Sequence, residues 1–170
     1  DVLVYPWIGC SNCPTCKKGD TNLCEAPKSL GVFQDGGYAE YSLVPDYKFL
    51  AKISGIDLDG AASLACSGLT AYTAIKKAMS NSPENILIVG AGGLGLMGVQ
   101  IARALSKANI ICADLDDEKL GKAKEMGAHD IVNTKDSESS KKIMSICNEK
   151  GADSIVDFVN APPTVKLDLS

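Results

Sequence analysis

The apolar residues in the second half of the chain fall into two alternating patterns. Short β-branched runs bounded by turn residues, typical of buried strands, alternate with segments whose apolar residues recur at helical period. The expected elements are strand 85–89, helix 94–106, strand 109–113, helix 117–126, strand 130–132, helix 137–148 and strand 154–158. Strands that alternate with helices through short loops form a parallel sheet covered on both faces. We therefore expect an α/β fold with a doubly wound parallel sheet of about four strands.

The first half shows a different pattern, in which short strands are separated by glycine and proline. Val2 and Val4 alternate within a strand that Pro6 ends. The segment 36–45 predicts a turn that leads into a strand, and the segment 47–53 predicts a further strand. This part of the chain is therefore expected to be rich in β-structure.

The pattern becomes helical from Asp57 onward. Asp59 is expected to cap a short helix, and a longer helix is expected to begin near Cys66. We place a domain boundary at this change of pattern, which divides the chain into domains 1–65 and 66–170.

The stretch that joins the first strand of the second half to its helix carries a glycine pattern. Gly90, Gly92 and Gly95 occupy the G-x-G-x-x-G positions, and Gly93 adds a fourth glycine. The first glycine makes the turn, the second lets the backbone approach a pyrophosphate, and the third lets the helix pack closely on the strand. A tight turn also needs glycine without any ligand, so the pattern alone leaves both interpretations open. The apolar face expected for the helix comprises Leu94, Met97, Ile101 and Leu105.

An acidic residue at the end of the next strand favours the nucleotide interpretation. Asp114 follows the strand 109–113 and lies nineteen residues after Gly95. A carboxylate here can accept both ribose hydroxyls of an adenosine and repels a 2′-phosphate, and no arginine stands beside it. The alternative is that Asp114, like Asp116 and Asp117 after it, only favours the start of the next helix. We favour the ribose role, which predicts NAD rather than NADP as the cofactor.

Four of the seven cysteines are clustered near the start of the chain. Cys10, Cys13, Cys16 and Cys24 follow the spacing C-x2-C-x2-C-x7-C. Such turns hold two sulfurs near one ion, and four thiolates surround a tetrahedral zinc without leaving a position for water or substrate. The spacing therefore predicts a structural zinc site. The alternatives are a redox pair, two disulfides, or a zinc ribbon that binds nucleic acid, which normally uses two well-separated cysteine pairs.

Composition and charge narrow the classes of function. A net charge of −4 argues against a surface for nucleic acid or anionic membranes. The longest apolar run, 86–99, is too short and too rich in glycine to span a membrane. An odd cysteine count without a secretory signal indicates a reducing compartment, so we expect a cytoplasmic protein. His129 is the only histidine, so a Ser-His or Cys-His mechanism has no second candidate base. We expect His129 to be solvated or to serve packing, and Cys112 and Cys147 to be small buried residues.

Four features of the chain, and the order in which they occur, resemble the zinc-dependent, medium-chain alcohol dehydrogenases, above all their archaeal and bacterial NAD-dependent members. They are the cysteine cluster, the turn at 36–41, the segment 66–70 and the glycine turn. The resemblance covers essentially the whole chain. It implies that residues 1–65 are part of a β-rich, GroES-like catalytic domain with a structural-zinc lobe. Residues 66–170 would be part of a Rossmann domain that binds NAD.

The resemblance also implies roles for individual residues. Cys66 matches one ligand of a catalytic zinc, and Thr70 matches the residue that packs against the nicotinamide. Trp7 resembles a residue of the substrate pocket and Lys119 one near the adenosine ribose, although ordinary packing and a solvated helix lysine are the alternatives. The residues expected to bind the cofactor are Thr70, Gly90, Gly92, Gly93, Leu94, Gly95, Asp114 and Lys119.

The expected function is reversible hydride transfer between a small alcohol, or the matching aldehyde or ketone, and NAD. Alternatives are a polyol, sugar or amino-alcohol dehydrogenase of the same family, and a non-catalytic NAD-binding scaffold stabilised by zinc. We expect the full-length protein to be a dimer or tetramer. The chain opens within a strand pattern and a helical pattern begins at Asp168, which suggests a piece of a longer protein. The family's other catalytic-zinc ligands have no counterpart here, so this chain alone is expected to be inactive.

Overall fold

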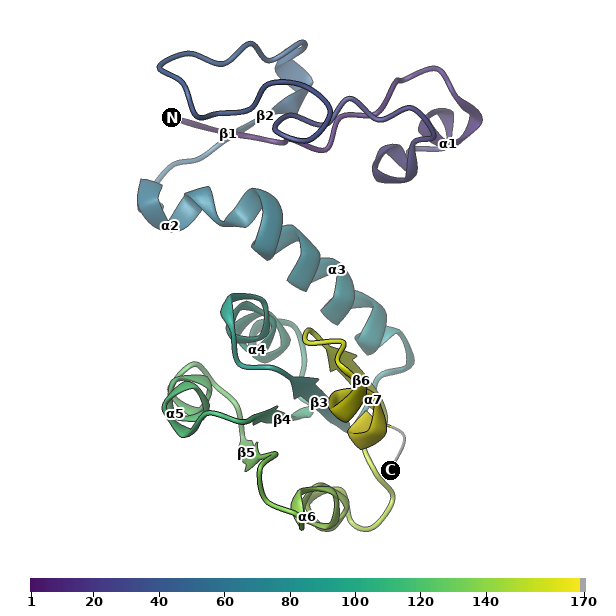
Figure 1. The fold of residues 1–170 in the computed structure, drawn as a ribbon, viewed down its shortest axis with the longest axis vertical. Helices are drawn as coiled ribbons and strands as arrows, with labels where there is room; N and C mark the ends of the chain where they lie inside the picture. Colours follow the sequence, from purple (N-terminus) through teal and green to yellow (C-terminus); the bar gives the residue numbers. More distant parts are fainter. Residues whose placement is uncertain (169–170) are drawn as a thin grey trace. The chain divides into compact units, whose positions relative to one another are not determined.

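The fold was determined as a computed structural model that describes residues 1–168. Contacts between residues divide it into two compact units, of which the first is Asp1–Ala65 and the second begins at Cys66 (Figure 1). The assignment of these units to a catalytic and a cofactor-binding domain stays a prediction from the sequence.

The first unit contains short elements joined by long loops. They are β1 (Val2–Val4), α1 (Pro14–Lys17), η1 (Thr21–Leu23), η2 (Tyr47–Phe49), β2 (Leu50–Lys52) and α2 (Leu58–Ala62). β1 and β2 pair antiparallel, with Val2 opposite Lys52 and Val4 opposite Leu50. The strand predicted within 36–45 is wrong, because these described residues form neither helix nor strand. A strand needs a neighbour for its N–H and C=O groups, and neither β1 nor β2 pairs with this segment.

The helix α2 begins earlier than the sequence suggested. The carboxylate of Asp57, not that of Asp59, accepts a hydrogen bond from the N–H of Gly60 at 2.8 Å. Asp57 stands three residues before Gly60, where a capping side chain reaches the free N–H groups of the first turn. Asp59 lies inside the first turn instead.

The second unit is an α/β domain with a four-stranded parallel sheet. The strands lie in the order β5-β4-β3-β6. The element η3 (Leu64–Gly68) spans the boundary at Cys66. The elements that follow it are α3 (Leu69–Ala78), η4 (Met79–Asn81), β3 (Asn85–Val89), α4 (Gly93–Leu105), β4 (Asn109–Asp114), α5 (Asp117–Glu125), β5 (Asp130–Asn133), α6 (Ser139–Ile146), β6 (Ser154–Asp157) and α7 (Pro162–Asp168). The predicted doubly wound sheet is confirmed. The last helix starts at Pro162, so the expectation that a helix begins at Asp168 was wrong, and residues 169–170 lie outside the described part.

Helices lie on both faces of this sheet (Figure 1), and apolar side chains pack between the helices and the strands. On one face, side chains from α3, α4 and α5 pack against Ile86, Ile88 and Ile110. On the other face, Ile143 of α6 and Leu167 of α7 pack with Leu87 and Ile111. Alternate residues of one strand thus serve opposite cores, as expected for a buried parallel strand.

The buried face of α4 differs from the apolar face predicted for it. The helix buries Gly95, Gly98, Val99 and Ala102. Leu94, Met97 and Ile101 are only half-buried, and Leu105 is 49% exposed. Small side chains let the helix axis approach the strands, so the surface in closest contact is the one with least apolar volume.

Candidate functional site

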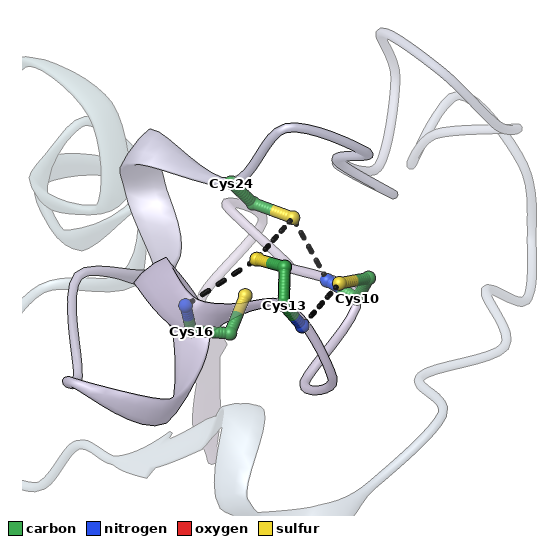
Figure 2. Close-up of side chains that lie close together, drawn as sticks. All are labelled: Cys10, Cys13, Cys16 and Cys24. Carbon is green, nitrogen blue, oxygen red and sulfur yellow. Dashed lines mark hydrogen bonds between the residues drawn. The ribbon is translucent and has the colours of Figure 1, made fainter.

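The four clustered cysteines lie around the two short helices that follow β1. Cys10 and Cys13 precede α1, Cys16 is within it, and Cys24 directly follows η1. Figure 2 shows their sulfurs turned toward one another. All four Sγ atoms lie within 4.8 Å of one another, and those of Cys13 and Cys24 are 3.9 Å apart. Backbone N–H groups donate to these sulfurs, among them those of Cys10 to Cys24 at 3.2 Å and of Cys16 to Cys13 at 3.4 Å. Such donors stabilise negative charge on sulfur.

This arrangement fits a tetrahedral zinc. Zinc–sulfur bonds of about 2.3 Å place the four sulfurs about 3.8 Å from one another, which matches the 3.9 Å between Cys13 and Cys24 and lies within the 4.8 Å that encloses all four. Hydrogen bonding, first from the N–H of Cys16, lowers the pKa of the Cys13 thiol to about 6. Burial instead raises the pKa of the Cys16 thiol to about 12. Thiols with such different pKa values become thiolates together beside a cation, which favours the charged form of each. The cluster is therefore compatible with a structural zinc site.

Gly9 also shapes the cysteine cluster, and the sequence reasoning missed it. A Cβ at this position would lie 2.7 Å from Sγ of Cys16 and 2.9 Å from the carbonyl oxygen of Thr21. Only glycine leaves room for the loop to close over the sulfurs. The signal in the sequence was the glycine directly before the first cysteine.

The glycine turn of the second unit has the geometry expected from its sequence. Gly90 has a φ of +95°, in the left-handed region that favours glycine. A Cβ on Gly95 would lie 1.6 Å from the carbonyl oxygen of Gly90, so the helix packs directly on the turn. A Cβ on Gly92 or Gly93 would meet no atom of the described chain within 4 Å. The space beside these two glycines is thus open, while the other two are required by the fold.

The first turn of α4 has no side-chain cap. Gly92 occupies the N-cap position and provides no side-chain acceptor. α5, by contrast, is capped by Asp116, whose carboxylate accepts the N–H groups of Glu118 and Lys119. An uncapped helix start next to open space offers N–H donors and a positive dipole end to an anion such as a phosphate.

Asp114 lies at the carboxyl end of β4 and is tied to the glycine turn. Its Oδ2 accepts the N–H of Ala91 at 2.6 Å, and its Oδ1 accepts the N–H of Asp116 at 3.0 Å. An ionised carboxylate offers about four acceptor positions, so about two stay available for a ligand. The same side chain can therefore fix the turn and bind a pair of hydroxyls.

An apolar slot of about 450 Å³ is lined by Leu115, the residue after Asp114, and was not predicted from the sequence. It opens at the carboxyl ends of the strands, where Leu115 follows β4, Thr134 follows β5 and Val159 follows β6. Its volume falls in the range of small-molecule sites. Its position next to the point where the strand order reverses, between β3 and β6, is where doubly wound sheets bind ligands. The sequence signal was the apolar residue directly after Asp114.

The other predicted site residues are placed as follows. Cys66 is exposed on the π-helical turn η3, and Thr70 is exposed in the first turn of α3. Single π-turns occur often at functional sites. Lys119 is exposed on α5, within the turn that Asp116 caps. Trp7 is half-buried, and its Nε1 donates to the carbonyl oxygen of Ala65 at 3.0 Å.

Hydrogen bonds hold His129, whereas Cys112 and Cys147 are buried as expected. Nδ1 of His129 accepts the N–H of Ile110 at 2.9 Å, and the N–H of His129 donates to the carbonyl of Ile110 at 2.8 Å. These bonds fasten the entry of β5 to β4. Cys112 and Cys147 are buried, and burial raises the pKa of the Cys112 thiol to about 12, which keeps it uncharged.

Among the helices of residues 1–168, none combines the length and the apolar character that a membrane crossing requires.

Comparisons with known proteins agree with these features. The model of the alcohol dehydrogenase GroES-like domain matches residues 1–55, and that of the zinc-binding dehydrogenases matches residues 93–170. An NAD-dependent alcohol dehydrogenase of Sulfurisphaera tokodaii is 42% identical over 167 residues, which are 98% of this chain and 48% of that protein. The chain thus spans about half the length of the curated relatives it matches.

Solved structures show the same likeness. The alcohol dehydrogenase of the archaeon Aeropyrum pernix superposes with a TM-score of 0.85 at 31% identity, covering 97% of this chain and 49% of that one. The D-arabinose dehydrogenase of Sulfolobus solfataricus superposes with a TM-score of 0.90 at 28% identity, covering 98% and 53%. These findings confirm the predicted combination of a GroES-like part with a Rossmann sheet. The chain belongs to the family of zinc-dependent, medium-chain alcohol dehydrogenases.

Proposed function

We propose that this chain is part of an enzyme that moves hydride reversibly between an alcohol and NAD. The observation that carries the proposal is the open glycine turn at the reversal of strand order, with Asp114 beside it. The names of the relatives, NAD-dependent alcohol dehydrogenases at 41–42% identity, support the same reading. A small alcohol and the matching aldehyde or ketone would be the substrates.

The proposed cofactor contacts combine the open glycine turn with the roles that the family resemblance implies for Thr70 and Lys119. The N–H groups of Gly92, Gly93 and Leu94, at the uncapped start of α4, would bind the pyrophosphate. The free acceptor positions of Asp114 would bind the adenosine ribose, and a 2′-phosphate there would be repelled. The apolar slot beside Leu115 would take the adenine ring, and Lys119 would lie near the ribose. Thr70 would pack against the nicotinamide.

Two zinc roles are proposed for the cysteines. Cys10, Cys13, Cys16 and Cys24 would hold a structural ion, since four thiolates leave no open position. Cys66 would hold one position of a second ion, whose other ligands would come from residues beyond this chain. That ion, when bound, supplies a Lewis acid that lowers the pKa of the alcohol. Trp7 would line the substrate pocket. By itself this chain is expected to show no turnover.

A sugar or polyol dehydrogenase is the second candidate. The similarity to the D-arabinose dehydrogenase supports it, although it fits no better than an alcohol dehydrogenase. A non-catalytic NAD-binding scaffold is the third, and it predicts cofactor binding without turnover. We further propose that the full-length protein is a homo-oligomer and that it works in the cytoplasm, where thiols stay reduced.

Turnover by the full-length protein tests the proposal. NADH formation should be followed with primary, secondary and polyhydric alcohols. The class of alcohol that is oxidised fastest distinguishes an alcohol dehydrogenase from a sugar or polyol dehydrogenase. Cys66→Ser should abolish turnover and leave NAD binding intact, because it removes a thiolate ligand outside the adenosine site. Cys147→Ala, which removes a buried thiol of no proposed role, is the matched control and should stay active. NAD binding without turnover on any alcohol would favour the scaffold.

A further inference from the structure

One carboxylate holds the loop that follows β6. Oδ1 of Asp157, the last residue of the strand, accepts the N–H of Val159 at 2.7 Å and that of Asn160 at 2.9 Å. Its Oδ2 accepts the hydroxyl of Thr164 at 2.6 Å. Three donors on one carboxylate fix the loop against the strand, because hydrogen bonds to an ionised acceptor are the strong ones.

Thr164 closes this network from the other side. Its Oγ1 accepts the N–H of Ala161 at 3.0 Å while it donates to Asp157. The carbonyl of Ala161 lies 2.9 Å from the same Oγ1, but a hydroxyl has a single proton, and the carboxylate is the stronger acceptor. Between these anchors Asn160 has a φ of +51°, a left-handed conformation that a free loop rarely keeps. The loop 158–161 is therefore held in one shape by two side chains.

That loop borders the glycine turn and the apolar slot, the two places proposed to bind the adenosine half of the cofactor. Cγ2 of Val159 lies 2.6 Å from where a Cβ of Gly90 would be, so the valine occupies the space that the glycine leaves. Val159, Ala161 and Thr164 also line the apolar slot. The shape of the loop thus sets one wall of the slot and its distance from the glycine turn.

We propose that Asp157, acting through Thr164, is a positioning residue that sets the affinity for the adenine half of the dinucleotide. This inference rests on the proposed function, because it takes the slot to be the adenine site. Asp157 touches no substrate or cofactor in this account. It acts by holding Val159 and Ala161 where the ring would pack.

The experiment measures ligand binding by the full-length protein. Thr164→Val keeps the volume of the side chain and removes its hydroxyl, while Thr164→Ser keeps the hydroxyl. Dissociation constants are measured for NAD, for ADP-ribose as the adenine half and for nicotinamide mononucleotide as the other half. Thr73→Val is the matched control, because the exposed hydroxyl of Thr73 donates only to the carbonyl of Leu69 within α3.

We expect Thr164→Val to weaken NAD and ADP-ribose about ten-fold, because a loop released from its hydrogen bond to the carboxylate must be ordered again when the ligand binds. Thr164→Ser should restore both. The nicotinamide mononucleotide constant should not change, since Thr70, which is proposed to pack against the nicotinamide, is on α3 and not on the loop. Thr73→Val should bind like wild type. If Thr164→Val does not fold, Thr164→Ala serves instead. It removes the hydroxyl without placing a branched apolar side chain beside the carboxylate of Asp157, and it should weaken the same two ligands.

A folded variant without the hydroxyl that binds ADP-ribose like wild type would overturn the inference. Equal weakening of both halves, or a serine variant as weak as the valine variant, would overturn it as well, because either points to general damage or to the lost methyl group. A wild-type protein that binds neither NAD nor ADP-ribose would contradict the proposed function itself. That result can be told apart from the results for the Thr164 variants.

Discussion

Gly95→Ala tests how closely α4 rests on the glycine turn. The added Cβ would lie 1.6 Å from the carbonyl oxygen of Gly90 and 2.8 Å from its carbonyl carbon. Ordinary contacts begin at 3.4 Å, so the helix or the turn must move by about 1.8 Å, the difference between 1.6 and 3.4 Å. Both obstacles are backbone atoms, and no side-chain rotation can relieve the overlap.

The loss of stability expected for Gly95→Ala lies at the upper end of the range for overpacked interiors. Inserting a methyl group into a packed interior costs about 1–3 kcal/mol, and a backbone obstacle on the glycine turn leaves little room to relax. We expect the free energy of unfolding to fall by about 3 kcal/mol, a large share of the usual total for a domain. NAD affinity should fall too, because the start of α4 moves with the helix.

Urea unfolding of the full-length protein measures this loss, and two other glycines provide controls. Gly121→Ala, inside α5, meets no described atom within 4 Å and should stabilise by about 1 kcal/mol through helix propensity. Gly92→Ala should leave stability within about 1 kcal/mol of wild type but abolish NAD binding, because its methyl group fills the proposed phosphate space. An unfolding curve for Gly95→Ala that matches wild type would refute the close packing of α4.

Three further predictions concern the metal, pH and the exposed surface. The 170-residue chain should hold about one tightly bound zinc, which Cys13→Ser removes and Cys147→Ser does not; disulfides found among the clustered cysteines would contradict the site. Hydrogen bonds from the N–H groups of Lys119 and Glu118 lower the pKa of Asp116 below 3.8, so its stabilising contribution is present above that pH and is lost as the pH falls through the lowered value. Asp116→Asn keeps the cap and should flatten the acid side of a stability–pH curve; an unchanged curve would remove Asp116 from this role. The isolated chain should bind a hydrophobic dye and self-associate, because Phe33, Tyr38, Tyr41 and Leu43 are exposed; a monomer that binds no dye and melts cooperatively would contradict this.

The parallel sheet could be predicted because its signals are local. Each strand of the second unit is a short apolar run with its own turn residues, and the structure places them within one or two residues of the expected bounds. The strand predicted within 36–45 was wrong for the opposite reason. A strand forms only beside a partner strand, and the local sequence does not show whether a partner is present. The face of α4 was misjudged because Gly95 and Gly98 add nothing to an apolar count. They are nevertheless the residues that let the helix approach the sheet.

The parts of the candidate sites with a fixed spacing could also be predicted. The cysteine cluster and the glycine turn are set by short-range geometry, so their spacing carries the chemistry. The apolar slot could not be found this way, because its walls follow three different strands and meet only in the folded sheet. The second role of Asp114, which ties Ala91 to the end of β4, was hidden for the same reason.

The most direct test of the central claim is an equilibrium titration of the full-length protein with NAD and NADP, for wild type and for Asp114→Gly. Glu125→Gln, an exposed carboxyl on α5, is the control and should bind like wild type. We predict that wild type prefers NAD and that Asp114→Gly weakens NAD far more than NADP, because only NAD loses a pair of ribose hydrogen bonds. An unchanged preference in Asp114→Gly would contradict the assignment of Asp114 to the ribose and of this turn to the adenosine half of NAD.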